Sequence, residues 1–150
     1  MKYFWGFLFI VAFGCSEVRF IGAYDPKVDD AIESISKQVA GIFVELEDRI
    51  DNQKDWSYAQ FKDTYMKIDK DLRALRIRVN GLSRYGIIKD QLDLLEQSIG
   101  KLAKDHQSGF VAPGVTDPSQ LKKSIAVDER AISASLSAML ALQDELKRKK

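Results

Sequence analysis

The sequence predicts an all-α protein: an up-down-up-down four-helix bundle that follows a short apolar N-terminal segment. Apolar residues recur at alternating spacings of three and four along four separate stretches, which is the pattern of helices with one buried stripe each. Only 3 prolines and 9 glycines occur in 150 residues, so long helices are not interrupted. The charged fraction of 30% is typical of helices with solvated outer faces.

The N-terminal segment has the composition of a secretory signal. Lys2 provides a positive charge, and an apolar run of twelve residues then extends to Gly14. As a helix this run covers about 18 Å, well short of the ~30 Å hydrocarbon core of a bilayer. Small residues at Ala12 and Gly14 occupy the positions that a signal peptidase reads. We therefore predict a signal peptide over residues 1–14 and cleavage before Cys15.

The sequence AFGC at residues 12–15 resembles the lipobox of bacterial lipoproteins, whose cysteine is diacylated. Ala12 stands where that family usually has leucine. Cys15 is the one cysteine of the chain, so no disulfide can form within it. The resemblance implies an acylated N-terminus at Cys15, a tether over residues 15–24, and outer-membrane sorting because Ser16 follows the cysteine. Two or more acyl chains on one residue anchor a protein stably.

The first helix is predicted to begin at Asp25-Pro26, where an acidic N-cap precedes a proline at the first helical position. It is expected to end near Asp51-Asn52. Phe43 widens its apolar stripe. The stripe itself comprises Val28, Ile32, Ile35, Val39, Ile42, Leu46 and Ile50.

The second helix has the clearest pattern in the chain. Ser57 and Gln60 have the spacing of a capping box at its start, and Asn80-Gly81 predicts a left-handed stop at its end. Between them the spacing of three and four is unbroken. Its stripe comprises Tyr58, Phe61, Tyr65, Ile68, Leu72, Leu75 and Val79.

The third and fourth helices follow a glycine-bounded break at residues 81–86. The third is expected to end near His106, before Gly109, and Asp117-Pro118 repeats the start signal of the first helix. The third stripe comprises Ile88, Leu92, Leu95, Ile99 and Leu102, and the fourth comprises Leu121, Ile125, Ile132, Leu136, Met139 and Leu146. Because a single helix cannot bury its own apolar stripe, the four helices are expected to pack together as one bundle domain over residues 25–150. A three-helix coiled bundle is the alternative if the 81–86 break only kinks one helix.

The charge balance excludes a general nucleic-acid binder. Removing residues 1–14 takes away one of the 23 basic residues and none of the 22 acidic residues, which leaves 22 of each. A protein that binds nucleic acid by its phosphates carries a basic excess. No nucleic-acid partner is therefore expected.

The sequence offers little for catalysis, which usually needs clustered histidines, cysteines or carboxylates. It has one histidine and one cysteine, and the Glu-x-x-His pattern of diiron bundles is absent because Ala103 lies three residues before His106. A role for His106 as a haem or metal ligand, together with Met139, is the alternative to a polar residue at a helix end. We predict a non-enzymatic protein without metal or cofactor.

A buried polar site is predicted around Asp128, because the fourth stripe skips from Ile125 to Ile132 and this carboxylate occupies the position between them. Counting from the helix ends places Asp128 near the level of Tyr65. A buried charge is costly without a partner. The expectations are a polar pocket, a structural hydrogen bond between Asp128 and Tyr65, or a stripe that drifts past the carboxylate.

Charge is expected to separate along the bundle axis. The anchored end gathers basic residues, and these are a candidate membrane-facing surface: Arg76, Arg78, Arg84, Lys147, Arg148, Lys149 and Lys150. The alternative is that they complement the C-terminal dipoles of the second and fourth helices. The opposite end collects Glu45, Glu47, Asp48, Asp51 and Asp55, with Trp56 and Tyr58 as candidate contacts for a partner.

These patterns predict a lipid-anchored protein of the bacterial cell envelope, at the outer membrane and facing the periplasm. Its expected role is an interaction or structural module with an envelope protein as partner, and apolar seams left exposed would make it a homo-oligomer. In overall texture it resembles small helical envelope lipoproteins of Gram-negative bacteria. The alternative function is a periplasmic carrier that holds a hydrophobic or metal-containing ligand between the helices.

Overall fold

The computed structural model describes residues 22–110 and 118–149. Within these ranges the chain forms four α-helices and no strand: α1 (Pro26–Asp51), α2 (Tyr58–Asn80), α3 (Gly86–Gln107) and α4 (Pro118–Arg148). The all-α prediction is confirmed. The predicted signal peptide (1–14), Cys15, most of the 15–24 tether, Asp117 and Lys150 lie outside the described residues.

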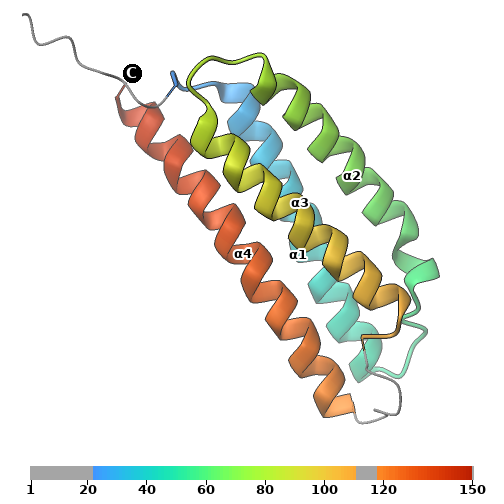
Figure 1. Ribbon diagram of the computed structural model, residues 1–150. Helices are drawn as coiled ribbons and strands as arrows, with labels where there is room; N and C mark the ends of the chain where they lie inside the picture. Colours follow the sequence, from blue (N-terminus) through green and yellow to red (C-terminus); the bar gives the residue numbers. More distant parts are fainter. Residues whose placement is uncertain (1–21, 111–117, 150) are drawn as a thin grey trace, which may run out of the picture.

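The helices run alternately up and down, so that consecutive helices are antiparallel neighbours (Figure 1). α1 contacts α2 and α4, and α3 contacts the same two helices, which makes a square without diagonal contacts among the described residues. α2 and α3 are separate helices, and this decides for the four-helix bundle over the three-helix alternative. We call the end with the α2–α3 turn and the end of α4 the proximal end, and the end with the α1–α2 turn the distal end.

The predicted apolar stripes form the core. Their residues are at most 8% exposed, apart from Ile50 and Tyr58, which are half-buried at the distal end. Phe43, beside the first stripe, is also buried. The burial of these stripes is the main stabilising contribution, at about 1.5–3 kcal/mol for each large apolar side chain. Within the described ranges, no helix combines the length and apolar character needed to cross a membrane.

The start of α1 is fixed by one carboxylate with two roles. Asp25 caps the helix by accepting a hydrogen bond of 2.9 Å from the backbone N–H of Lys27. The same carboxylate accepts hydrogen bonds of 2.7 and 2.6 Å from one terminal nitrogen of Arg78 on α2. Burial alone would raise the pKa of Asp25, but the Arg78 guanidinium and the backbone donors together lower it. The cap therefore also joins α1 to α2.

The α2–α3 turn differs in detail from the predicted left-handed stop. Gly81 has a φ of −77°, and the left-handed residue is Arg84, with a φ of 63°. The turn also receives the N-terminal segment, because the Gly22 N–H donates to the Arg84 carbonyl at 2.9 Å. Tyr85 is 3% exposed and its hydroxyl donates to the carbonyl of Ala23 at 2.5 Å. The chain that leads to the predicted anchor is thus attached to the proximal end.

Candidate functional site

The α1–α2 turn is shaped by backbone bonds at the end of α1. The N–H of the C-cap residue Asn52 donates to the Asp48 carbonyl at 3.0 Å, and Gln53 follows in the left-handed region with a φ of 53°. The N–H of Lys54 then donates to the Arg49 carbonyl at 2.8 Å. After this tight reversal, Asp55 to Ser57 complete the turn and lead into α2, which begins at Tyr58.

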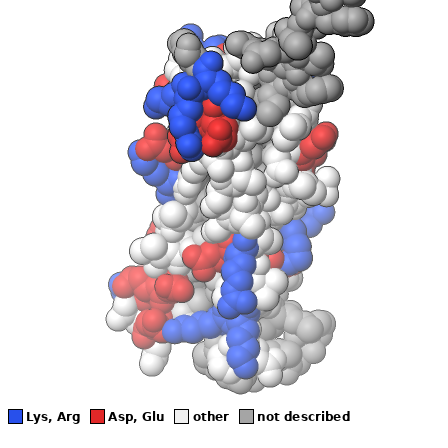
Figure 2. Space-filling view, turned by 90° about the vertical axis from the view of Figure 1, so that its left-hand side faces the viewer, with Lys and Arg blue, Asp and Glu red and all other residues white. Residues whose placement is uncertain are grey.

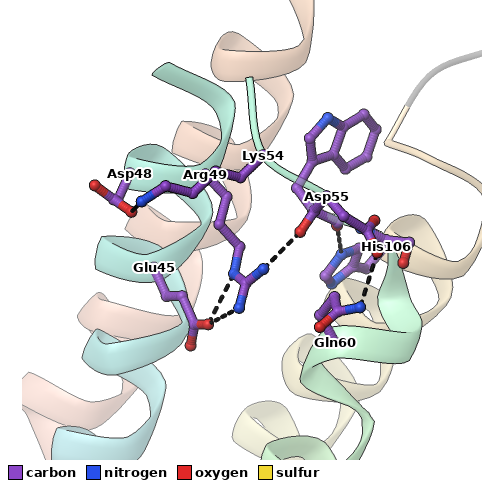
Figure 3. A network of polar contacts seen from close by, with 9 residues as sticks. Glu45, Asp48, Arg49, Lys54, Asp55, Gln60 and His106 are labelled. Atoms are coloured by element: carbon purple, nitrogen blue, oxygen red, sulfur yellow. Dashed lines mark hydrogen bonds and ion pairs between the residues drawn. The ribbon is translucent and has the colours of Figure 1, made fainter. Parts of the chain in front are cut away.

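Charged side chains hold this turn against both helices (Figure 3). Arg49 donates to Glu45 at 2.8 Å within α1 and to the Asp55 carbonyl at 2.7 Å in the turn. Lys54 donates to Asp48 at 2.8 Å. All these groups except Arg49 are exposed, so solvent screens each pair and its contribution to stability is small; the main effect of the pairs is to fix the turn.

Asp55 replaces the predicted capping box at the start of α2. Ser57 makes no capping bond with its side chain. Instead, the Asp55 carboxylate accepts a hydrogen bond from the Ser57 N–H at 2.9 Å and another from the Gln60 side chain at 2.8 Å. The bond from the Ser57 backbone is the largest effect that lowers the pKa of Asp55. The start of α2 and its N-cap residue, Ser57, were predicted correctly, but the side-chain bonds of the predicted capping box are not formed.

His106 lies under this turn, 2% exposed, rather than at a frayed helix end. Its Nε2 is 2.7 Å from the Trp56 carbonyl oxygen, and its Nδ1 is 3.0 Å from the Tyr65 hydroxyl. A carbonyl only accepts, so Nε2 carries the hydrogen and Nδ1 accepts from Tyr65. Both ring nitrogens are therefore engaged, and a metal or haem iron can bind His106 only by displacing one of these partners.

An aromatic cluster surrounds the imidazole. The ring centroids of Phe61 and Phe110 each lie 4.9 Å from that of His106, and the Tyr58 centroid lies at 5.8 Å with its ring nearly perpendicular. Such apolar contacts disfavour the charged form, so burial lowers the pKa of His106. Burial likewise raises the pKa of Tyr65. Both groups are neutral at physiological pH.

A hollow of about 330 Å³ opens beside this cluster. Trp56, Tyr58 and His106 form its aromatic part. Its polar part comprises Lys54, Asp55, Ser57, Gln107 and the backbone of Gly109. Trp56 and Tyr58 are only half-buried, so aromatic surface remains open to a ligand or partner. This volume lies at the lower limit of small-molecule pockets, which measure about 300–1,000 Å³.

Asp128 is buried, at 4% exposed, so the stripe does not drift past it, but the hydrogen bond with Tyr65, one of the three alternatives, is not formed. Its Oδ1 accepts a hydrogen bond of 2.6 Å from Lys101 on α3, and Lys101 also bonds to Asp105. Tyr65 turns to His106 instead, although it lies near enough for the charge of Asp128 to contribute to its raised pKa. The second carboxylate oxygen of Asp128 has no hydrogen-bond partner within residues 22–110 and 118–149. Lys101 was missed because it lies outside the apolar stripe.

Gln143 is a buried polar residue that the sequence prediction missed. Its side chain is fully buried, and neither its amide nitrogen nor its amide oxygen has a hydrogen-bond partner among the described residues. The spacing contained the signal, because position 143 continues the stripe of three and four from Met139 to Leu146. The stripe of α4 is thus interrupted by polar residues at two levels, Asp128 and Gln143.

The basic residues at the proximal end do not form one free surface. Arg76 pairs with Glu96 at 2.8 Å and Asp93 at 2.5 Å on α3, and Arg78 is held by Asp25. Lys147 lies 5.8 Å from the centroid of the Tyr24 ring, and Arg148 pairs with Glu145 at 3.1 Å. Arg84 and Lys149 are exposed. Arg76 and Arg78 therefore connect helices.

The acidic residues of the distal end are also largely paired. Arg49 balances Glu45, Lys54 balances Asp48, and Lys122 at the start of α4 pairs with Asp51. The aromatic hollow, rather than negative charge, is the distinguishing feature of this end.

Comparison with known proteins returns no matching family model, no matching curated protein and no matching solved structure. The function must therefore be inferred from the residues themselves.

Proposed function

We propose that this protein is a lipid-anchored module of the bacterial cell envelope, non-enzymatic, that binds an envelope partner through the hollow at its distal end. The observation that carries the proposal is the position of this hollow. Half-buried aromatic residues line it, and it lies at the far end of the bundle from the segment at Gly22 that leads back to Cys15. Anchoring at Cys15 would hold the proximal end at the outer membrane and present the distal end to the periplasm.

Two features of the distal end support partner binding. Trp56 and Tyr58 provide aromatic surface of the kind enriched at protein interfaces. The turn that carries Trp56 and leads to Tyr58 is held in place by Arg49, Asp55 and His106 (Figure 3), so little conformational entropy is lost on binding. A rigid aromatic site at the free end of an anchored helical bundle is consistent with an interaction module.

The second candidate is a carrier for a small molecule, and the volume of the distal hollow favours it. In that case the ligand would lie against Trp56 and Tyr58 at the distal end rather than between the helices near Asp128. Its polar lining would select a molecule that combines an apolar ring face with hydrogen-bonding groups.

Photo-cross-linking in cells tests the partner-binding site. A photoreactive residue at Gln107, on the rim of the hollow, is expected to capture an envelope protein. The substitution Trp56→Ala is expected to abolish this capture. Gln97 provides the matched control, since it is also an exposed glutamine of α3 but lies away from the hollow. Capture of the same protein from both positions, or of none from Gln107, would contradict the partner-binding proposal.

A further inference from the structure

One side of the bundle carries a long uncharged surface. The α4 segment from Ala131 to Gln143 contains no charged residue. Several of its small residues are exposed: Ala131, Ser133, Ala134, Ser137, Ala138 and Ala141. Figure 2, which views the side on which α4 lies, shows an uncharged area in the middle and charged side chains above and below it. Solvated helices seldom keep so long an outer face without charge.

Large apolar side chains of α3 extend this surface. Ile87 is 49% exposed and Leu94 is 51% exposed. The Lys101–Asp128 pair and the packing of Ile87 near Leu142 fix the register of the two helices, and this register places Leu94 level with the middle of the uncharged α4 segment. Val127 on α4, 61% exposed, continues the surface toward the distal end. We call this surface of α3 and α4 the apolar face.

The charges at the two ends of the apolar face complement each other. Arg130 lies in its distal part, between Val127 and Ala131, and Asp144 and Glu145 border it on the proximal side. If a second copy packs antiparallel, with the two-fold axis between Ser137 and Ala138, Arg130 of each copy faces Glu145 of the other. A parallel pair would instead place Arg130 against Arg130 and Glu145 against Glu145, and such contacts between like charges are unfavourable.

The same register matches the small residues. It pairs Ala134 of each copy with Ala141 of the other, so two helices can approach to the lower end of the ~8–10 Å axial range. Ile87 and Leu94 would lie at the edges of the contact. Because the centre consists of small side chains, we expect a weak and reversible pair.

From this surface and its charges we infer that the apolar face binds a second copy of the chain in antiparallel orientation. This goes beyond the proposed function and does not depend on it. The orientation has a geometric consequence for anchored copies. α4 spans about 46 Å, more than the tether's reach of roughly 35 Å, so two anchored copies of one leaflet can form this pair only if both bundles lie along the membrane rather than upright on it.

Cysteine cross-linking of the full chain, purified in detergent, tests the orientation. In a Cys15→Ala background, each chain receives one cysteine, either Ala134→Cys or Ala141→Cys, and a tag of distinct size. Mild oxidation of the mixture is expected to link Ala134→Cys to Ala141→Cys. Ala134→Cys alone should not link to itself, because two such positions lie about 10 Å apart along the axis, beyond disulfide reach.

Charge exchange provides the second measurement. Arg130→Glu in the Ala134→Cys chain is expected to lower the yield of the mixed disulfide several-fold, and Glu145→Arg in the partner chain should restore it. In both facing pairs, residue 130 of one chain and residue 145 of the other then carry opposite charges again. Self-linking of Ala134→Cys would show a parallel pair and overturn the inference. An absence of mixed disulfide, with a monomer by sedimentation at high concentration, would overturn it as well.

Discussion

His106 joins the elements that pack in the interior of the distal end. Its ring contacts Phe61 on α2 and Phe110 after α3, and its two nitrogens bond to the turn and to Tyr65. Protonation would place a hydrogen on Nδ1 facing the Tyr65 hydroxyl, which would then have to redirect its own hydrogen inside an apolar cluster. The folded state therefore favours the neutral imidazole.

We predict a loss of stability on mild acidification because the folded pKa of His106 is lowered below its usual 6.5. Below pH 6.5 the unfolded chain binds a proton that the folded chain does not. The free energy of unfolding is therefore fully retained above pH 6.5. It falls by up to about 1.4 kcal/mol per pH unit as the pH drops toward the folded pKa. Urea unfolding at pH 7.5 and 5.5 measures this difference.

The control for this pH dependence is His106→Gln, which removes the single histidine of the chain. Its stability should change less between the two pH values than that of the wild type. An NMR titration of the wild-type imidazole gives an independent value if the variant folds poorly. A measured pKa at or above 6.5 would contradict the proposed burial of neutral His106.

Among the helices, α4 has the least regular core stripe. In the part of the chain that the structure describes, one carboxylate oxygen of buried Asp128 is unpaired and the amide of buried Gln143 has no partner. A buried amide without hydrogen bonds costs about 1–3 kcal/mol. Either residue lowers the stability that α4 gains from packing, while Lys101 compensates only Asp128.

We expect Gln143→Met to raise the free energy of unfolding by about 1–3 kcal/mol, because methionine has a similar shape and helix propensity but buries no amide. The matched control is Gln97→Met at an exposed position of α3, which should change stability by less than about 0.5 kcal/mol. Urea denaturation of both variants measures the difference. Destabilisation by Gln143→Met would indicate that the amide has a partner in solution.

At the scale of the whole molecule, apolar spacing was sufficient to predict the fold. Four stripes predicted four helices with ends correct to within about two residues, because each helix is amphipathic over its full length. The distal hollow was predicted only through its candidate contacts, Trp56 and Tyr58. Its shape depends on the left-handed Gln53 and on hydrogen bonds of Asp55 and His106 across three elements, which spacing along one helix does not encode.

The intact mass and membrane fractionation of the full chain, expressed in a bacterial host beside Cys15→Ala, test the proposed anchor most directly. We predict a wild-type chain that begins at Cys15, is heavier by its acyl groups and sediments with the outer membrane. Cys15→Ala should lose both the added mass and the membrane association. A wild-type chain without acyl groups, in the soluble fraction, would contradict the proposal of a lipid-anchored envelope module.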